Sequence, residues 1–279
     1  MDTNRQYKSS VFALFFDDAE KLIELYNAIE NTDYAKDTPI EINTLKDALF
    51  LDRLNDISFL LDGKLIVLIE HQSTPNENMP LRLLLYIGRV YEKIVNGKNI
   101  YRQKLIKIPK PDFIVLYNGD REFPDKSVLR LSDAFEDADI PSLLELTVNV
   151  YNVNHGRNPD ILRKSESLND YAVFIARAKA NKAAGMSLEA AIEEAINYCM
   201  ENGIMREFLE KHGSEVHNML FTEFDIDDAK LIWQEEARED KAEAIALKML
   251  KNGFRQDVVA ANTELSVSRI KELAARTMQ

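Results

Sequence analysis

The sequence is poor in cysteine, glycine and proline. Among its 279 residues there is one cysteine, Cys199, with nine glycines and eight prolines. A single cysteine cannot form an internal disulfide, so we expect the protein in a reducing compartment, the cytoplasm. With only four histidines beside it, it also excludes a structural zinc site of the Cys/His type. The low glycine and proline contents exclude a collagen-like or low-complexity chain.

Long hydrophobic runs are also lacking. Uninterrupted apolar stretches such as residues 11–16 and 65–69 fall far short of the roughly 20 residues that a membrane-spanning helix needs. The first ten residues are polar and lack the charged-then-apolar order of a signal peptide. From the sequence we therefore expect neither a membrane span nor a targeting segment.

Positive charge is the scarcer sign, with 35 Lys and Arg against 47 Asp and Glu and a formal net charge of −12. This balance argues against broad, unaided binding of nucleic acid. One segment opposes the general sign, because residues 89–110 carry seven basic residues against a single Glu. These basic residues are Arg89, Lys93, Lys98, Arg102, Lys104, Lys107 and Lys110. We expect them to contact DNA phosphates; the alternative is a solvated helix face followed by a loop.

The apolar periodicity predicts an α/β fold in the first part of the chain. We expect helices over 10–31 and 79–96, clear strands over 56–61, 65–70 and 112–117, and weaker strands over 40–52 and 143–153. From about residue 168 the strand pattern disappears. The expected elements there are two helices within 171–200 divided at 185–187, an acidic helix over 225–252 and a helical hairpin over 254–276. We therefore expect a core over 1–165 and a helical C-terminal region over 166–279.

The C-terminal hairpin has the apolar spacing of a helix-turn-helix, with Ser266 as the cap of its second helix. Two features argue against reading of DNA by this hairpin. Glu264 stands where the turn glycine is expected, and residues 255–276 carry a net charge of only +1. We therefore expect the hairpin to pack or self-associate, and we expect any homo-oligomer to form through these helical regions.

The most informative feature is a predicted hairpin whose turn contains Asp62-Gly63, a strong signal for this structure. Asp56 opens its first strand, and Glu70 and Gln72 close its second strand. Side chains alternate between the two faces of a strand, so the loop length decides which residues meet. A two-residue loop would put Asp56 and Glu70 on opposite faces, whereas a three-residue loop brings both onto the face of Gln72.

Two three-residue loops satisfy this condition, one over 61–63 and one over 62–64. Either would give two carboxylates and an amide on one face, which are oxygen ligands that suit Mg²⁺. Such a metal can activate a water and offset the charge of a phosphodiester. The alternative is that Asp56 only caps its strand and that residues 70–72 are merely the exposed end of the other.

Three stretches around this hairpin are typical of one protein family. They are Asn-Asp-Ile-Ser-Phe at 55–59, Val-Leu-Ile-Glu-His-Gln-Ser at 67–73 and Met-Pro-Leu-Arg-Leu-Leu-Leu-Tyr at 79–86. They resemble the Rpn family of bacterial recombination-promoting nucleases or transposase-like proteins, a branch of the PD-(D/E)XK nuclease superfamily. Residues 113–119 are similar to the next core strand of that family, and the likeness covers roughly residues 5–180.

The resemblance implies a restriction-endonuclease-like PD-(D/E)XK core, with a mixed sheet flanked by helices. It implies a metal-dependent DNA endonuclease that hydrolyses phosphodiester bonds in recombination or in defence against mobile DNA. It further implies that Asp56 and Glu70 bind Mg²⁺, for which Mn²⁺ can substitute, and that Gln72 is catalytic at the position of the superfamily's lysine. Because Gln72 carries no charge, it could orient a water or coordinate through its carbonyl. Catalysis is then either slower, or another cation replaces the lysine.

Three further residues bear on the candidate site. An acid from the first helix sometimes completes such sites, and Glu20 and Glu24 are the candidates. His71 alternates with Glu70 along the strand, so we expect it to be structural. The alternative function is that of a catalytically weak or inactive nuclease-fold protein that acts as a DNA-binding or protein-interaction module. The neutral Gln72 is compatible with both functions.

Overall fold

The computed structural model describes residues 10–42, 56–98, 100–101, 103–136, 142–266, 269–271 and 273–274, and at Asp56 and Glu70 the description covers the backbone. The chain divides into two compact units, Met1–Phe221 and Thr222–Gln279. Each unit is considered by itself.

The first unit contains both helices and strands, as the sequence predicts. They are α1 (Val11–Phe15), α2 (Ala19–Glu30), β1 (Ile40–Ile42), β2 (Asp56–Leu61), β3 (Leu65–Gln72), α3 (Met79–Val95), β4 (Lys110–Tyr117), β5 (Lys126–Arg130), a short 3₁₀ helix η1 (Leu131–Ala134), β6 (Thr147–Asn152), α4 (Pro159–Lys164), α5 (Glu166–Ala183), α6 (Leu188–Glu201) and the first part of α7 (Arg206–Lys251).

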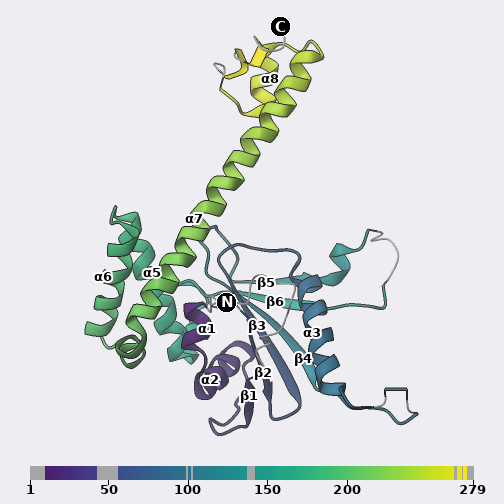
Figure 1. The fold of residues 1–279 in the computed structure, drawn as a ribbon, viewed down its shortest axis with the longest axis vertical. Coiled ribbons are helices and arrows are strands. Elements are labelled where there is room, and N and C mark those ends of the chain that lie inside the picture. Colours follow the sequence, from purple (N-terminus) through teal and green to yellow (C-terminus); the bar gives the residue numbers. More distant parts are fainter. Residues whose placement is uncertain are drawn as a thin grey trace, which may run out of the picture. The chain divides into compact units, whose positions relative to one another are not determined.

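The strands form one six-stranded mixed sheet in the order β1-β2-β3-β4-β6-β5 (Figure 1). β3, β4 and β6 run parallel, whereas the other neighbouring strands are antiparallel. The three parallel strands end at Gln72, Tyr117 and Asn152. We call this side of the sheet the carboxyl end, and the opposite side, where β2 turns into β3, the hairpin end.

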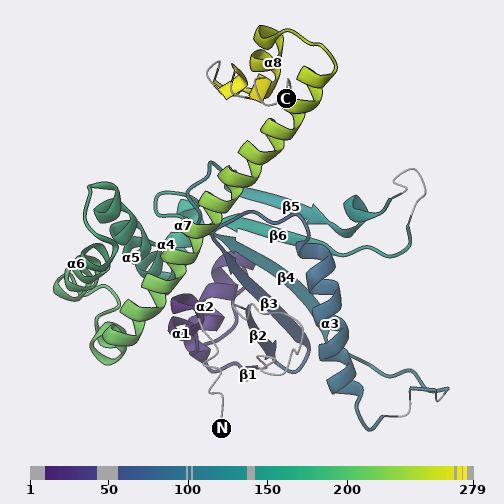
Figure 2. The same ribbon diagram turned by 45° about the horizontal axis from the view of Figure 1, so that its top comes forward.

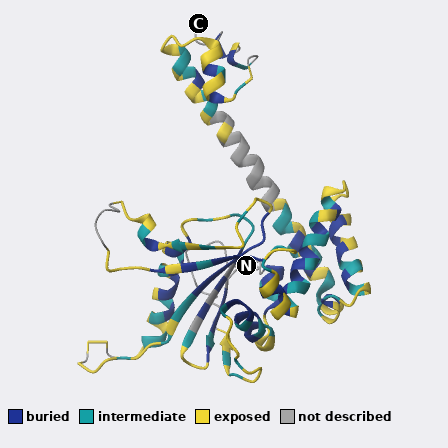
Figure 3. Ribbon diagram, turned by 180° about the vertical axis from the view of Figure 1, so that it is seen from behind, coloured by how far each residue is buried: buried dark blue, intermediate teal, exposed yellow. Residues whose placement is uncertain are grey.

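Helices cover both faces of the sheet (Figures 1 and 2). α3 joins one face through buried residues that it shares with β4 and β6, and we call this the α3 face. The shared core contains Met79, Leu83, Tyr86, Ile87, Val90, Phe113, Val115, Tyr117, Val148 and Val150. On the other face, the α2 face, Phe12 of α1 stacks on His71 of β3, and Tyr26 of α2 donates a hydrogen bond to Asp112 of β4. The central strands β4 and β6 are mostly buried, whereas the edge strands β1 and β5 are not (Figure 3).

The first helix differs from the prediction, because it is broken in two at residues 16–18. Ser10 accepts a hydrogen bond from the backbone N–H of Ala13 and starts α1, while Asp18 accepts one from Lys21 and starts α2. A side chain at the N-cap satisfies an otherwise unpaired backbone N–H, and Asp18 is well suited to this. The predicted single helix over 10–31 is therefore two capped helices.

Two strands outside the hairpin differ from the prediction. β5 was not predicted, because it is a short edge strand in which exposed and half-buried residues alternate and little of it adds to the core. The weak strand expected over 143–153 begins only at Thr147. Of the strand expected over 40–52, Ile40–Ile42 is observed, and residues 43–52 lie outside the described residues.

Two helices of the C-terminal half follow the prediction closely. α5 and α6 are divided at residues 184–187, and Ser187 caps α6 by accepting a hydrogen bond from Ala190 at 3.3 Å. α7 begins earlier than the acidic helix expected over 225–252. The boundary between compact units falls at residues 221 and 222, because α5 packs against α4 and α2 of the strand-containing part. The expected domain boundary at residue 165 stays a prediction about which parts fold independently.

The second unit consists of the rest of α7, α8 (Gln256–Thr263) and helical residues near the C-terminus. Its core joins Ala246, Val259, Ile270 and Leu273. Ser266 accepts a hydrogen bond from the backbone N–H of Arg269 at 3.2 Å, so the predicted cap is confirmed. Glu264 adopts a left-handed conformation with φ 58° at the turn, in the place where a glycine is usual. In neither unit does the described chain contain a helix long and apolar enough to cross a membrane.

Candidate metal and nucleic-acid site

The hairpin between β2 and β3 has a three-residue loop. Leu61 pairs with Leu65, so the loop is Asp62-Gly63-Lys64, the second of the two loops that the sequence left open. Asp62 and Gly63 have φ values of 48° and 65°, and the N–H of Lys64 donates to the carbonyl of Leu61 at 3.1 Å. A left-handed conformation at residue 63 is easily adopted by glycine.

This loop sets the register that the candidate site needs. Asp56 and Glu70 are direct partners across the antiparallel pair, and direct partners lie on the same face of a sheet. Gln72 follows Glu70 by two residues and belongs to the same alternating set. Leu60, another member of the set, packs against the core beneath α3. The positions of Asp56, Glu70 and Gln72 therefore belong to the α3 face.

Glu70 and Gln72 lie at the carboxyl end of the sheet, where ligands of α/β proteins commonly bind. The backbone carbonyl of Gln72 accepts a hydrogen bond from Asn118 at 2.9 Å, so β3 and β4 end side by side. The side-chain Nε2 of Gln72 lies 2.7 Å from Sδ of Met79 in the first turn of α3. The amide is thus held beneath the N-terminus of this helix.

His71 points to the other face and is buried there. Its ring stacks on Phe12 with a centroid distance of 4.7 Å, and its Nε2 lies 3.4 Å from the Tyr171 hydroxyl. The ring packs between α1 and α5 and does not face the position of Glu70. The expectation that His71 is structural agrees with these contacts.

The two candidate acids of the first helix are held elsewhere. Glu24 accepts hydrogen bonds from the hydroxyl of Ser165 at 2.8 Å and from the backbone N–H of Ser167 at 2.9 Å. A carboxylate in this place stabilises the N-terminus of α5. Glu20 is exposed and lies 3.8 Å from Lys36. Because α2 packs on the α2 face, the structure does not bring either acid to the α3 face.

A second polar cluster lies on the α2 face. Tyr26 donates to Asp112 at 3.0 Å, and Tyr151 donates to Glu30 at 3.3 Å. Burial, and after it the charge of Asp112, raises the pKa of Glu30 above its ordinary value. Burial likewise raises the pKa of both tyrosines. The cluster ties α2 to the sheet and is separate from the candidate site.

Ser58 adds a buried hydroxyl to the α3 face. It belongs to the same alternating set as Asp56, and it pairs with Leu68. The residue is fully buried, with 0% exposure, and among the described residues its hydroxyl has no hydrogen-bond partner. Such a group costs about 1–3 kcal/mol unless a water or ligand satisfies it.

The residue types at these positions are those that bind a hydrated Mg²⁺ ion in proteins. Two carboxylates and an amide provide oxygen ligands, and Mg²⁺ keeps several waters that buried hydroxyls can bind. Among the side chains that the structure describes, no group of three His, Cys, Asp or Glu could hold a metal; Asp56 and Glu70 are not among those side chains. The fit therefore rests on the register and on the orphaned hydroxyl of Ser58.

The basic segment lies at the hairpin end, away from these residues. The described Lys93, Lys98 and Lys104 are exposed, Arg89 is half-buried, and Arg102 lies outside the described residues. Lys110, the last residue of the segment, pairs with Leu65, which is five residues before Glu70. At about 3.3 Å per residue this is roughly 16 Å along the strand. The segment is near the hairpin in sequence, but it is not near the candidate carboxylates; its contact with DNA stays a prediction.

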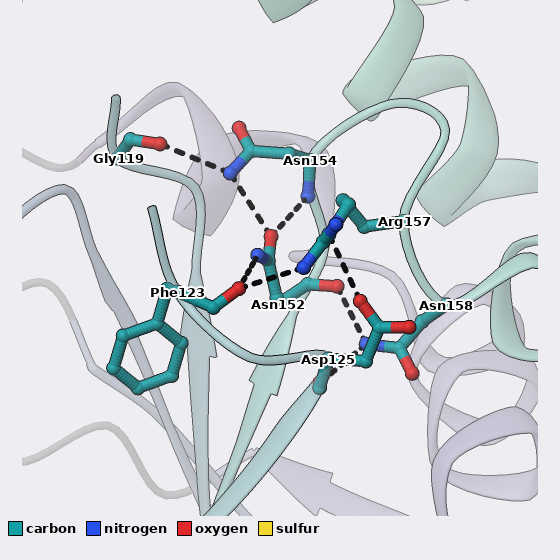
Figure 4. A network of polar contacts seen from close by, with 7 residues as sticks. All are labelled: Gly119, Phe123, Asp125, Asn152, Asn154, Arg157 and Asn158. Carbon is teal, nitrogen blue, oxygen red and sulfur yellow. Dashed lines mark hydrogen bonds and ion pairs between the residues drawn. The ribbon is translucent and has the colours of Figure 1, made fainter. Parts of the chain in front are cut away.

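An asparagine network that the sequence did not reveal joins the loops after β4 and β6 (Figure 4). Asn152 donates to the carbonyl of Phe123 at 2.9 Å. Its side-chain oxygen accepts from the backbone and side-chain nitrogens of Asn154 at 3.2 and 3.0 Å. Asn154 in turn donates to the carbonyl of Gly119 at 3.0 Å. The two loops are thereby fixed against each other at the carboxyl end.

The next loop residues complete the network. Asn158 donates to the carbonyls of Asp125 and Asn152 at 2.5 and 2.7 Å. Arg157 donates to the carbonyl of Phe123 and forms an ion pair with Asp125, each at 2.9 Å (Figure 4). The repeated asparagines over 152–158 are visible in the sequence. Their partners come from a distant loop, so no local pattern predicts the network.

Gly119 lies where the loop after β3 and the loop after β4 approach each other closely. A Cβ at this position would be 1.8 Å from the carbonyl oxygen of Ser73 and 2.6 Å from the Tyr117 hydroxyl. No other residue type fits without moving the loop that follows β3. The loops after β3 and β4 are therefore packed backbone against backbone at the carboxyl end.

The mixed sheet with helices on both faces is compatible with a nuclease-like fold. Residues 42–183, half of the chain, match the protein-family model described as "Putative transposase, YhgA-like". The chain belongs to this family, which is part of the Rpn/PD-(D/E)XK-like group, as the resemblance predicts. No match was found among curated proteins or among solved structures.

Proposed function

We propose that the protein is a metal-dependent DNA endonuclease with a PD-(D/E)XK-type core. In this proposal Asp56 and Glu70 bind Mg²⁺, Mn²⁺ can replace it, and Gln72 assists catalysis. The observation that carries the proposal is the direct pairing of Asp56 with Glu70 at the carboxyl end of the sheet. Membership of a transposase-like family supports DNA as the partner, and the order α2-β1-β2-β3-α3-β4 is similar to the order of the superfamily core.

The reaction requires a water oxygen to bond to phosphorus, one P–O ester bond to break, and the leaving oxygen to take up a proton. A bound Mg²⁺ supplies a more acidic water and offsets negative charge on the phosphate. The two carboxylates hold the ion by charge and by oxygen ligation. Gln72 can accept a hydrogen bond from the attacking water through Oε1 and donate one through Nε2, which orients that water.

One residue favours a second function. Gln72 is neutral at the position of the superfamily's lysine and cannot stabilise developing negative charge by itself. A nuclease fold that lacks this cation can persist as a DNA-binding or protein-interaction module. The two functions differ in whether purified protein breaks DNA when Mg²⁺ is present.

Nicking of supercoiled plasmid tests the proposal, with Mg²⁺, with Mn²⁺ and with EDTA. We expect nicking with either metal and none with EDTA. Asp56→Asn and Glu70→Gln should abolish nicking because each removes a metal ligand. Asp62→Asn, in the exposed loop of the same hairpin, is the matched control and should nick like the wild type.

Two results would overturn the proposal. If both ligand variants nick at the wild-type rate, the site lies elsewhere in the chain. If the wild type binds DNA but does not nick it with either metal, the second function is correct. Thermal melting of each variant shows whether the fold is intact, which we expect because the two changes remove charge and keep the side-chain shape.

A further inference from the structure

The candidate site lacks a positive side chain within its own strand, since Gln72 is neutral. Hydrolysis of a phosphodiester concentrates negative charge on the phosphate in the transition state, and a fixed cation there accelerates such reactions. We propose that Arg82 of α3 supplies this cation. The inference rests on the proposed function, because it concerns the same site and the same reaction.

The contacts of Met79 bring Arg82 to the site. Sδ of Met79 lies 3.2 Å from Nη1 of Arg82 and 2.7 Å from Nε2 of Gln72. The two nitrogens are therefore at most about 5.9 Å apart, the sum of these two distances. A guanidinium thus lies beside the amide that takes the place of the superfamily's lysine. It comes from a different element, the helix that crosses over from β3 to β4.

α3 is firmly anchored where it holds Arg82. Met79 is fully buried, and Leu83 and Tyr86 are at most 5% exposed, so the first turns of the helix are fixed against the sheet. Residues three apart on a helix are neighbours, which explains why Arg82 reaches back to Met79. Arg82 itself is half-buried. The guanidinium of Arg82 can thus reach the α3 face of the sheet, and the anchored helix limits the directions in which the side chain can point.

Arginine is suited to this task. Its guanidinium stays charged at every pH at which proteins function, and its planar set of N–H donors matches two oxygens of a phosphate. A thioether is only a weak acceptor and carries no charge, so Met79 itself does not neutralise the guanidinium. Arg82 can therefore donate to the phosphate while Gln72 orients the water.

Two other cations near the carboxyl end, Arg157 and Lys179, are bound to loop residues. Arg157 pairs with Asp125 and donates to the Phe123 carbonyl. Lys179 pairs with Asp120 at 2.7 Å and donates to the carbonyl of Asn118. These contacts fix both cations to loop acids and carbonyls, whereas Arg82 contacts the same sulfur as Gln72.

The first experiment compares Arg82→Gln and Arg82→Lys with wild type in single-turnover plasmid nicking. We expect Arg82→Gln to lower the cleavage rate about 100- to 1,000-fold, the effect of losing one charge-stabilising group. Arg82→Lys should lose less because the charge remains. Arg163→Gln, an exposed arginine on α4, is the matched control and should cleave at the wild-type rate.

The second experiment moves the cation back into the strand. Gln72→Lys in the Arg82→Gln background recreates the superfamily's arrangement. We expect this double variant to cleave at least about tenfold faster than Arg82→Gln alone. In the wild-type background the same change should add little. A side chain that only supports the fold would not be replaced by a lysine on another element.

The third measurement is Mg²⁺ affinity without DNA, by titration calorimetry. Removing a positive charge beside a metal site reduces repulsion, so Arg82→Gln should bind Mg²⁺ as tightly as wild type or more tightly. If Arg82 were only structural, Mg²⁺ affinity and the melting temperature would both fall.

The outcomes separate this inference from the proposed function. Loss of nicking in Asp56→Asn together with wild-type nicking in Arg82→Gln overturns the role of Arg82 alone. A folded double variant that is as slow as Arg82→Gln, or weaker Mg²⁺ binding in Arg82→Gln, overturns it as well. A wild type that neither nicks DNA nor binds Mg²⁺ overturns the proposed function itself.

Discussion

At the carboxyl end of the sheet the polar groups are bonded to one another, whereas at the hairpin end the charged groups are exposed. The carboxyl end holds the asparagine network and the paired positions of Asp56 and Glu70. The hairpin end leads to the basic segment, where Tyr101 is 92% exposed. Most of the described residues over 96–110 are exposed as well (Figure 3). The proposed function would place catalysis at the ordered end and contacts with DNA phosphates at the end with exposed charge.

The difference shows why the basic segment, although close to the hairpin in sequence, lies away from the candidate carboxylates. A parallel connection must return the chain to the start of the next strand. α3 therefore carries the chain from the carboxyl end back to the hairpin end before β4 begins. The first turn of α3, with Arg82, stays at the candidate site, and the residues after its last turn do not.

The largest effect is expected from Gly119→Ala, which tests how tightly the carboxyl end is packed. The new Cβ would lie 1.8 Å from the Ser73 carbonyl, so the loops must separate. We expect the free energy of unfolding to fall by about 3 kcal/mol or more, with loss of cleavage. Gly88→Ala on α3 has no atom within 4 Å of its new Cβ. As the control it should stabilise the protein by about 0.5–1 kcal/mol. Equal chemical-denaturation midpoints for the two variants would contradict the packing argument.

The next effect is expected from Gly63→Val, which links the hairpin end to the carboxyl end through the register. Gly63 has φ 65°, where a β-branched residue is strained by about 1–3 kcal/mol. We expect lower stability and, if β2 slips by one residue, weaker Mg²⁺ binding in calorimetry. Gly63→Asn should be milder because asparagine enters this region more readily. A destabilised Gly63→Val protein with wild-type Mg²⁺ affinity would show that the register does not slip.

The double variant Lys98→Ala/Lys104→Ala tests the exposed charge at the hairpin end. We expect weaker DNA binding, about equal for unrelated sequences, and a salt slope reduced by about 2. The cleavage rate at saturating DNA should not change, because these residues are far from Glu70. Fluorescence anisotropy over a range of salt concentrations measures the slope, with the exposed pair Lys36→Ala/Lys211→Ala as control. The same slope in both double variants would exclude the segment from DNA contact.

The smallest effect is expected from Ser58→Ala. Removing a buried hydroxyl that has no partner among the described residues should raise metal-free stability by about 1 kcal/mol. Mg²⁺ binding should weaken by about tenfold if that hydroxyl binds a water of the ion. Ser127→Ala, on edge strand β5, removes another buried hydroxyl without a partner in the described chain, and it should leave Mg²⁺ binding unchanged. Equal Mg²⁺ affinities in both variants would separate Ser58 from the metal.

Strong local patterns predicted most of the elements that position the site. The continuous apolar runs of β3 and β4 and the 3.6-residue period of α3 come from burial, which sequence periodicity records directly. β5 was missed because an edge strand buries little, and the break at Asp18 was missed because an apolar period continues across it. The candidate site could be predicted in part for a related reason: whether Asp56, Glu70 and Gln72 share a face depends only on the length of the loop.

The rest of the site depends on contacts between distant segments. Both three-residue loops would place Asp56, Glu70 and Gln72 on one face, and the pairing of Leu61 with Leu65 decides between them. Arg82 could not be selected from the sequence because its position over β3 follows from the packing of Met79. The asparagine network likewise joins residues about thirty positions apart, and only the fold brings them together.

The three-residue loop has a consequence for changes of length in the hairpin. Adding or deleting one residue there exchanges the two faces of β2 relative to β3, whereas a change of two residues keeps them. Under the proposed function, relatives that bind the metal should therefore differ from this chain at the loop by even numbers of residues, or carry a bulge in one strand that restores the count. The length of a turn some 16 Å from the carboxylates thus limits which insertions this family can accept.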